Sequence, residues 1–442
     1  MAYRKLEEKL LILLIAVGPI LFWPYSYDEF REVKETFFHI VALGVFICSI
    51  SEYLLLPSEK RLGFLRVYHD LGTGKYIAAL LVISAVAFSI SYLLNEHTPH
   101  GFRTLMNYMA GIMLFFSFVK IVSVDRGERW LKIFLIPVLI NAVMGIAQYS
   151  GHDPFFESLD ADFHEVYRKY RVAGFMDSPN MLAPLICSIA PFLFLKTVYA
   201  RMGKEFISYL FLLAVVLVPL ILSENLGGIL SLGAVFVFLL IVLSVHFKKG
   251  GGLELSKLIV IWILFAVTLL FFTQRLVNMD SDSRAIKKWS MLERMSQYQA
   301  SYQMFTESPI IGKGPGYYFR HFVEYRRAAW IGNPPPVLVT RSAHQAHNDF
   351  LQFLGEGGLI STIPLLGIIG IILYICFRFL GTYLNGGPPD EKRLVALASF
   401  SGFTVININA LSNFPYHVAP LAVSAVFFGA LFLTTARQGE RR

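Results

Sequence analysis

Charged residues and cysteines are scarce in this chain. Asp, Glu, Lys and Arg make up 16% of the 442 residues, whereas hydrophobic residues make up 55%. Soluble globular domains have about 25% charged residues, so this composition excludes an ordinary soluble domain and indicates a protein with many membrane-spanning helices. The cysteines, Cys48, Cys187 and Cys376, lie within apolar runs, which argues against a disulfide framework or a cysteine metal cluster.

Apolar runs long enough to cross a bilayer recur along the whole sequence. A spanning helix needs about 20 mostly apolar residues. Twelve runs fit, with approximate bounds 8–23, 36–56, 76–94, 105–122, 133–149, 180–198, 206–222, 226–246, 258–273, 350–377, 394–412 and 418–436. The sequence therefore predicts an all-α polytopic membrane protein with about twelve transmembrane helices and a single membrane domain over residues 1–442. No small-residue cleavage site follows the first run, so it is expected to remain as an anchor.

Lysines and arginines orient these helices. Most of the 39 basic residues fall in alternate connecting segments, which include both ends of the sequence. Because short cytoplasmic loops are enriched in Lys and Arg, both termini are predicted to be cytoplasmic. Residues 274–346, between the ninth and tenth helices, are then predicted to form a large helical insertion on the outer face. The net charge of +8 reflects this asymmetry and does not indicate nucleic-acid binding.

Polar residues gather in the stretch "SAHQAHNDFLQFLGEGGLIS", where the tenth helix begins at the outer face. Asn348 or Asp349 is expected to cap the first turn of this helix, with Asp349 favoured. Glu356 lies deeper in the helix, where a carboxylate is costly unless it meets water or a positive partner. His344 and His347 are three residues apart, but no third ligand is evident, so no metal site is predicted.

The outer loop before the sixth helix contains "RVAGFMDSPNMLA". Arg171 and Asn180 flank its Gly-Phe turn, just above the membrane. An arginine there can bind phosphate oxygens through two parallel hydrogen bonds. The alternative is an interfacial arginine that reaches toward lipid headgroups.

The long outer insertion begins with the helix-like stretch "SMLERMSQYQASYQMFTES". Its apolar residues are spaced by three or four, which predicts a helix lying on the membrane or on other helices; they are Met291, Met295, Tyr298, Tyr302 and Phe305. Arg294 lies beside this stripe. The following "PIIGKGPGYYF" predicts a tight turn, but it lacks the spacing of a phosphate-binding loop, so no nucleotide role is assigned to it.

Four segments together resemble motifs of the O-antigen ligase and O-antigen polymerase superfamily. "HNDFLQFLGEGGL" is similar to its His-Asn, Leu-Gln, Glu-x-Gly-Leu-Ile signature, and "RVAGFMDSPNMLA" to its Arg-x-x-Gly-x-Phe-x-x-x-Asn-x-x-Ala element. "RMSQYQASYQMFTESPIIGKGPGYYF" resembles its Arg, aromatic, Ala, Pro, Gly-x-Gly element, and "YDEFREVKETFF" its Asp-to-Lys stretch, here Asp28 to Lys34. These motifs span most of the chain in the expected order, and the first is close to the ligase form.

The resemblance implies a lipid-linked glycan transferase of the bacterial inner membrane, with its active site facing the periplasm. In such enzymes undecaprenyl diphosphate carries the glycan, arginines hold the diphosphate, and a histidine activates an acceptor hydroxyl without metal or nucleotide. The implied partners are this donor, lipid A-core or another glycan acceptor, and membrane lipid, with no cofactor. His347 is the predicted catalytic base. The predicted substrate-binding residues are Arg171 and Arg294 on the diphosphate, with Asn180, His344 and Asn348.

One departure concerns the charge at the diphosphate site. Relatives commonly have Ser-Arg at the turn between the seventh and eighth helices, whereas this chain has Glu224 and Asn225. Arg275, Arg284 and Arg341 are candidates to replace the missing arginine.

Several functions remain open at this stage. A polymerase would pass the glycan to another diphosphate-linked unit, and transfer to pilin is a further activity within the same superfamily. Twelve helices also suit a secondary transporter, although ionisable residues in mid-helix, which ion coupling usually needs, are almost absent from the sequence. A structural or scaffold membrane protein is the third class.

Overall fold

The computed structural model describes residues 2–23, 30–57, 61, 72–122, 126–153, 172–250, 281–329, 343–385 and 389–436, with isolated positions between 257 and 274. Within these residues the chain is helical and has no strand. Nine of the described helices are long and apolar enough to cross a membrane. They are α2 (Arg31–Leu55), α4 (Lys75–Leu94), α5 (Pro99–Ile121), α6 (Gly127–Tyr149), α8 (Pro179–Tyr199), α9 (Lys204–Leu222), α10 (Leu226–Lys248), α15 (Asp349–Leu384) and α17 (Ala419–Ala436).

The prediction of an all-α multi-pass membrane protein is thus confirmed, while the count of twelve stays a prediction. Helices α1 (Ala2–Val17) and α16 (Glu391–Asn409) coincide with two further predicted spans. The predicted span at 258–273 lies mostly outside the described residues. The other described elements are α12 (Ser281–Glu307), α13 (Tyr317–Ala329) and three short 3-10 turns, η1 (Gly18–Ile20), η2 (Gly72–Gly74) and η4 (Pro415–His417).

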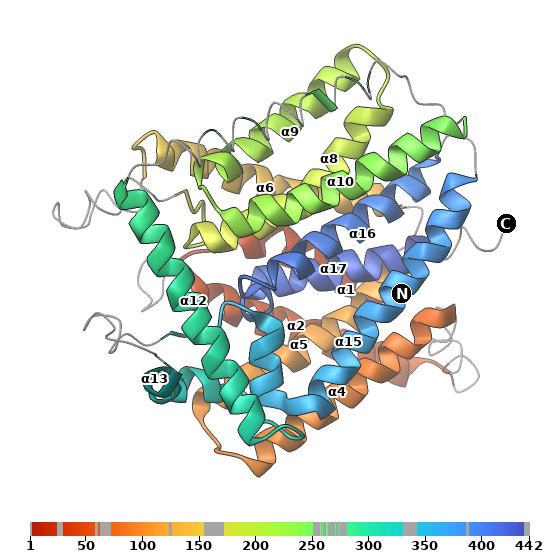
Figure 1. The fold of residues 1–442 in the computed structure, drawn as a ribbon. Helices are drawn as coiled ribbons and strands as arrows, with labels where there is room; N and C mark the ends of the chain where they lie inside the picture. The colour runs from red at the N-terminus through yellow and green to blue at the C-terminus, as the bar shows by residue number, and fades with distance from the viewer. Residues whose placement is uncertain are drawn as a thin grey trace.

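Helices α8, α16 and α17 form the centre of the bundle. Of the candidate membrane spans, α8 and α17 are the most enclosed, with 94% and 78% of their most apolar stretches buried against 22% for α9. Figure 1 shows α16 and α17 between α8 and α10 on one side and α15 and α4 on the other. Since lipid is as apolar as a side chain, close packing rather than water exclusion joins such helices. Gly402 illustrates this, because a Cβ on it would lie 2.5 Å from the Ser188 carbonyl oxygen of α8.

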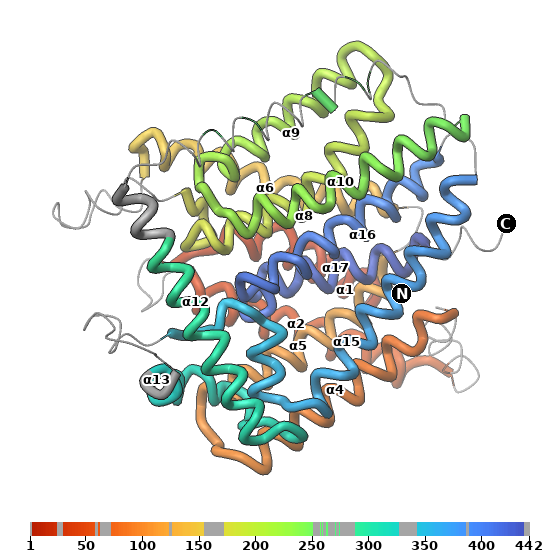
Figure 2. The backbone as a smooth tube through the Cα atoms, viewed as in Figure 1, coloured from red at the N-terminus to blue at the C-terminus, as the bar shows by residue number. Residues whose placement is uncertain are grey.

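The two ends of the bundle differ in chemistry. One end contains buried lysine pairs, such as Lys120 with Glu7 at 2.5 Å and Lys196 with Glu128 at 2.9 Å. Both described ends of the chain, at residues 2 and 436, lie there. The opposite end contains α12, α13 and the beginning of α15 (Figure 2), and we call it the α12 end. Both described ends of the chain therefore lie on one side of the bundle and the insertion on the other, while the assignment of the first side to the cytoplasm stays a prediction.

A glycine break divides α15 near the α12 end. Gly358 has φ 62° and ψ −169°, which interrupts the helix. The turn at residues 309–314 inserts at this break, and we call it the wedge turn. Its backbone pairs with backbone groups of α15 on both sides of the break. Lys313 N donates to Gly355 O at 3.0 Å, and Leu359 N donates to Pro309 O at 2.9 Å. The predicted tight turn therefore has a structural role, which is to join the insertion to the membrane helix.

Glu356 lies buried beside this break. Its Oε1 accepts hydrogen bonds from Gln352 Nε2 at 3.2 Å and from the Tyr318 backbone N at 3.3 Å. The sequence led us to expect water or a positive partner for this carboxylate. Two amide N–H groups donate to it in the structure.

Helix α12 forms as expected, but its apolar stripe does not face other helices. Met291, Met295 and Tyr302 are more than half exposed. The opposite face is buried against α15, and its residues are small or polar: Ser296, Gln297, Ala300 and Ser301, with Met304. Met291, Met295 and Tyr302 therefore do not pack on a described helix, and the expectation that the stripe lies on the membrane stays a prediction.

Candidate active site at the α12 end

His347 lies in the segment 343–348 that leads into α15. Its backbone is left-handed, with φ 51°, a conformation uncommon outside glycine, asparagine and aspartate. Its carbonyl oxygen accepts a hydrogen bond from the Tyr298 hydroxyl of α12 at 3.1 Å. Its ring packs edge-on against Phe414, with centroids 4.8 Å apart. Nδ1 is buried and has no hydrogen-bond partner within the described residues by geometry, while the Asn413 side chain is close enough to the ring to favour its protonated form.

Arg294 lies one turn before Tyr298 on α12, close enough for its charge to act on His347. Burial, and then the positive charge of Arg294, lower the pKa of His347 to about 4. The imidazole is therefore neutral at pH 7, which is the form that accepts a proton. The left-handed backbone sets the position of His347 just before α15. Burial and the neighbouring guanidinium keep its imidazole uncharged.

The expected cap of α15 is corrected by the structure. Asn348, not Asp349, is the N-cap, and its Oδ1 accepts from Leu351 N at 3.0 Å. Its Nδ2 donates to the Leu411 carbonyl at 3.1 Å, so both amide atoms of this predicted substrate-binding residue are engaged. Asp349 turns inward because a stronger partner is there: its Oδ1 lies 2.5 Å from His417 Nδ1.

The Asp349–His417 pair also ties the end of the bundle together. Asp349 Oδ2 accepts from the Tyr416 backbone N at 2.8 Å. Burial disfavours the charged form of His417, but the Asp349 carboxylate overcomes this and raises the pKa of His417 above its usual value. The segment that follows α16 is therefore fixed beside residues 347–349, and it includes Phe414, which packs on His347.

Asn180 belongs to a second polar group at this end. It lies in the first turn of α8, where its Oδ1 accepts from Asn225 Nδ2 at 2.7 Å. Asn225 in turn caps α10 by accepting from Gly228 N at 2.7 Å. A Cβ on Gly227 would lie 3.0 Å from Asn413 Nδ2, which places this group beside the segment that contacts His347. Arg171, the other predicted phosphate-binding residue of this loop, lies outside the described residues.

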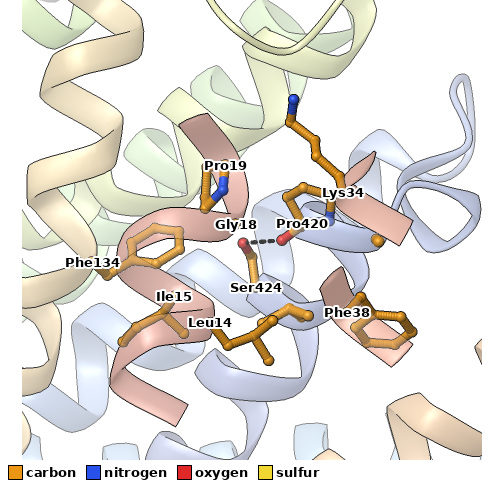
Figure 3. Close-up of a pocket in the computed structure, with 11 residues that line it drawn as sticks. Leu14, Ile15, Gly18, Pro19, Lys34, Phe38, Phe134, Pro420 and Ser424 are labelled. Atoms are coloured by element: carbon orange, nitrogen blue, oxygen red, sulfur yellow. Dashed lines mark hydrogen bonds between the residues drawn. The ribbon is translucent and has the colours of Figure 1, made fainter. Parts of the chain in front are cut away.

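The turn that follows Arg171 in the chain is held by two transmembrane helices. From α6, Gln148 Oε1 accepts from Ala173 N at 2.9 Å and Asn141 Oδ1 accepts from Phe175 N at 2.8 Å. From α2, Lys34 Nζ donates to Phe175 O at 2.7 Å, to Phe30 O at 3.2 Å and to Leu21 O. Figure 3 shows a small, mostly apolar pocket beside the Cα of Lys34. The Lys34 side chain points away from this pocket.

Lys34→Met is expected to destabilise the protein by about 1–3 kcal/mol, because buried carbonyl oxygens, among them Phe30 O and Phe175 O, lose a charged donor. Thermal unfolding in detergent measures the effect. Lys204→Met, which removes an exposed lysine of α9, is the matched control and is expected to change little. Equal unfolding temperatures for the two variants would contradict this role of Lys34.

A cavity of about 360 Å³ lies between α2, α4, α5, α15 and α17; we call it the α5 cavity. His344 and Gln345 line it, whereas His347 does not. The His344 ring packs on Phe319 of α13, with centroids 4.6 Å apart. The two histidines therefore face different surroundings, which separates His344 from the predicted catalytic base.

Motif-based prediction missed the polar residues at the wall of this cavity. Arg103 of α5 donates through Nε to Glu35 Oε1 of α2 at 2.6 Å, and Arg31 lies one turn before Glu35. The spacing of Arg31 and Glu35 on one helix was a visible signal, but Arg103 and His417 reach them from distant segments. Relatives commonly have an arginine at the turn where this chain has Glu224 and Asn225. Two of the candidates to replace it, Arg275 and Arg341, lie outside the described residues.

Comparison with known proteins supports the motifs. Residues 209–366 match the family model described as O-antigen ligase, which confirms the resemblance to the O-antigen ligase family. The matched region includes Arg294, His344, His347 and Asn348, and it ends within α15. No curated protein matches the chain.

Proposed function

We propose that this protein transfers a glycan from undecaprenyl diphosphate to an acceptor hydroxyl at the periplasmic face of the bacterial inner membrane, with O-antigen as the glycan and lipid A-core as the acceptor. The family match indicates a glycosyltransferase of the ligase or polymerase type that acts on a lipid-linked glycan. The observation that carries the finer proposal is the neutral, buried imidazole of His347 beside Arg294, at the end of a membrane helix.

The chemistry needs one base and positive charge. The acceptor oxygen attacks the anomeric carbon of the donor sugar, and the bond from that carbon to the diphosphate oxygen breaks. The proton of the acceptor hydroxyl passes to His347, which is unprotonated at neutral pH. The diphosphate leaves with the bonding electron pair, and Arg294, together with Arg171, stabilises its added charge. Asn180 and Asn348 complete the proposed substrate-binding set, whereas His344 lines the α5 cavity and is left out of it.

The test is transfer by the purified full-length protein in liposomes. The donor is undecaprenyl diphosphate-linked oligosaccharide, supplied with and without lipid A-core. Product that requires lipid A-core supports the ligase. Lengthening of the donor glycan without that acceptor identifies a polymerase instead. Ion-gradient-driven uptake of a labelled solute, with no transfer under either condition, would overturn the transferase proposal.

The pH dependence of transfer tests the electrostatic contact between Arg294 and His347. His347 acts unprotonated and its pKa is about 4, so the wild-type rate is expected to fall only as pH drops toward that value. Arg294→Gln removes a positive charge that opposes protonation, so the acid limb is expected to move to higher pH, in addition to a weaker affinity for the donor. Arg294→Lys, which keeps the charge, is expected to leave the limb near its wild-type position. An acid limb that is the same in the wild type and Arg294→Gln would contradict the contact.

A further inference from the structure

The α5 cavity changes from polar to apolar along α5, along α15 and from η4 into α17. On α5 the lining begins with Arg103, Thr104, Asn107 and Tyr108 and continues with Gly111, Ile112 and Phe115. With a rise of about 1.5 Å per residue, the distance from Arg103 to Phe115 is about 18 Å along the axis.

Two other segments repeat this order, whereas α2 contributes only polar residues and α4 only apolar residues. On α15 the lining runs from Asp349 through Phe353 to Ile372, and from η4 into α17 it runs from His417 to Gly429. A cavity with this gradient, set among membrane helices with its polar end at the α12 end, has the polarity of a lipid lying parallel to the bilayer normal. Its occupant is therefore expected to combine one polar head with a hydrocarbon chain.

The polar end has both signs of charge, and its carboxylates are near cations. Arg103 bonds to Glu35, which also accepts from Asn107. Asp349 bonds to His417 at 2.5 Å. Arg31 and Glu32 line the same region. A phosphate or diphosphate head would have to compete with these carboxylates for each arginine. The balance of positive and negative charge at the polar end therefore disfavours an anionic head.

Aromatic rings border this polar end. Phe319 of α13 packs on His344 at 4.6 Å and on His100 at 4.3 Å between centroids, and all three side chains line the cavity. Rings of this kind offer an apolar face, and the surrounding Asn107, Thr104 and carboxylates offer hydrogen bonds. A headgroup rich in hydroxyls and without charge, as in a sugar, fits both features.

We propose that the α5 cavity binds a glycolipid, with its chain between α5, α15 and α17 and its uncharged sugar head at Glu35, Arg103 and His417. This site is distinct from the His347 and Arg294 site, because neither of those residues lines the cavity. It goes beyond the proposed transfer reaction and holds whether or not the protein is a transferase.

Photolabelling of the full-length protein in phosphatidylcholine nanodiscs tests the site. The probe is an alkyl glucoside with a diazirine in its chain, and mass spectrometry locates the labelled residues. Label is expected on α5 and α15 among the cavity residues, and dodecyl glucoside is expected to displace the probe at least about tenfold better than dodecyl phosphate, a difference of about 1.4 kcal/mol in binding.

A matched pair of glycine variants separates the cavity from the lipid-facing surface. Gly111 lines the cavity, and a Cβ on it meets no atom within 4 Å, so Gly111→Leu fills the apolar part without displacing backbone. Gly233 of α10 has the same open surroundings but does not line the cavity. Gly111→Leu is expected to reduce labelling at least about tenfold, and Gly233→Leu to leave it unchanged.

Two results would overturn the assignment. One is labelling that Gly111→Leu leaves at the wild-type level. The other is displacement by dodecyl phosphate equal to or better than that by dodecyl glucoside, which would assign the polar end to anionic lipids. The displacement series uses wild-type protein and so stands even where a variant fails to fold.

Discussion

His347→Asn is expected to reduce glycan transfer by about 10²–10⁴-fold, the range that a general base contributes. His347 has a left-handed backbone with φ 51°, which asparagine tolerates better than alanine does. The substitution therefore removes the proton acceptor while keeping the local fold. Initial rates of transfer in liposomes, at saturating donor, measure the loss.

The control for this prediction is another histidine at the same end. His97 is exposed, and His97→Asn is expected to keep the wild-type rate. Binding of the donor lipid to the His347→Asn protein is expected to stay within about threefold, because the arginines rather than the imidazole hold the diphosphate. Transfer by His347→Asn within about tenfold of wild type would remove His347 from the mechanism.

The second large effect is expected from Gly358→Ala, which should cost at least about 3 kcal/mol of stability. The backbone of Gly358, with φ 62° and ψ −169°, lies in a region that is essentially restricted to glycine. A Cβ there would also lie 2.3 Å from the Ile310 carbonyl oxygen of the wedge turn. Both effects push the wedge turn out of the break in α15. Thermal unfolding and the yield of monodisperse protein in detergent measure the loss.

Gly370→Ala is the matched control, since this glycine lies in the same helix and a Cβ on it meets no atom within 4 Å. Replacing a glycine in a regular helix by alanine is expected to stabilise by about 0.5–1 kcal/mol. An unfolding temperature for Gly358→Ala equal to that of Gly370→Ala would mean that the break in α15 is not a requirement of the fold.

The sequence predicted the helices well because the bilayer imposes one simple pattern. A long apolar run has few options in lipid other than a spanning helix, and the described helices follow the predicted runs. The resemblance to a family gave Arg294 and His347 roles in one reaction, and those roles stay predictions. Neither the run lengths nor the residue intervals place α12 over segment 343–348.

The errors have local physical causes. Asp349 was the favoured cap of α15, yet the cap is Asn348 because His417, from a segment almost seventy residues later, binds the aspartate. The face of α12 that packs on α15 consists of small and polar residues, so the apolar stripe did not reveal it. The α5 cavity was missed for the same reason, since Glu35, Arg103 and His417 come from three separate elements.

The wedge turn also constrains the order in which this protein is assembled. A ribosome produces residues 309–314 before α15, but their hydrogen-bond partners, Gly355 and Leu359 among them, lie within α15. The turn therefore cannot complete these hydrogen bonds before α15 has been synthesised, although Gly312 and Phe319 can already contact the earlier Asn95 and His100. The end of the molecule that contains His347 is consequently completed late in biogenesis, and a nascent chain stalled before residue 355 lacks the α15 half of these contacts.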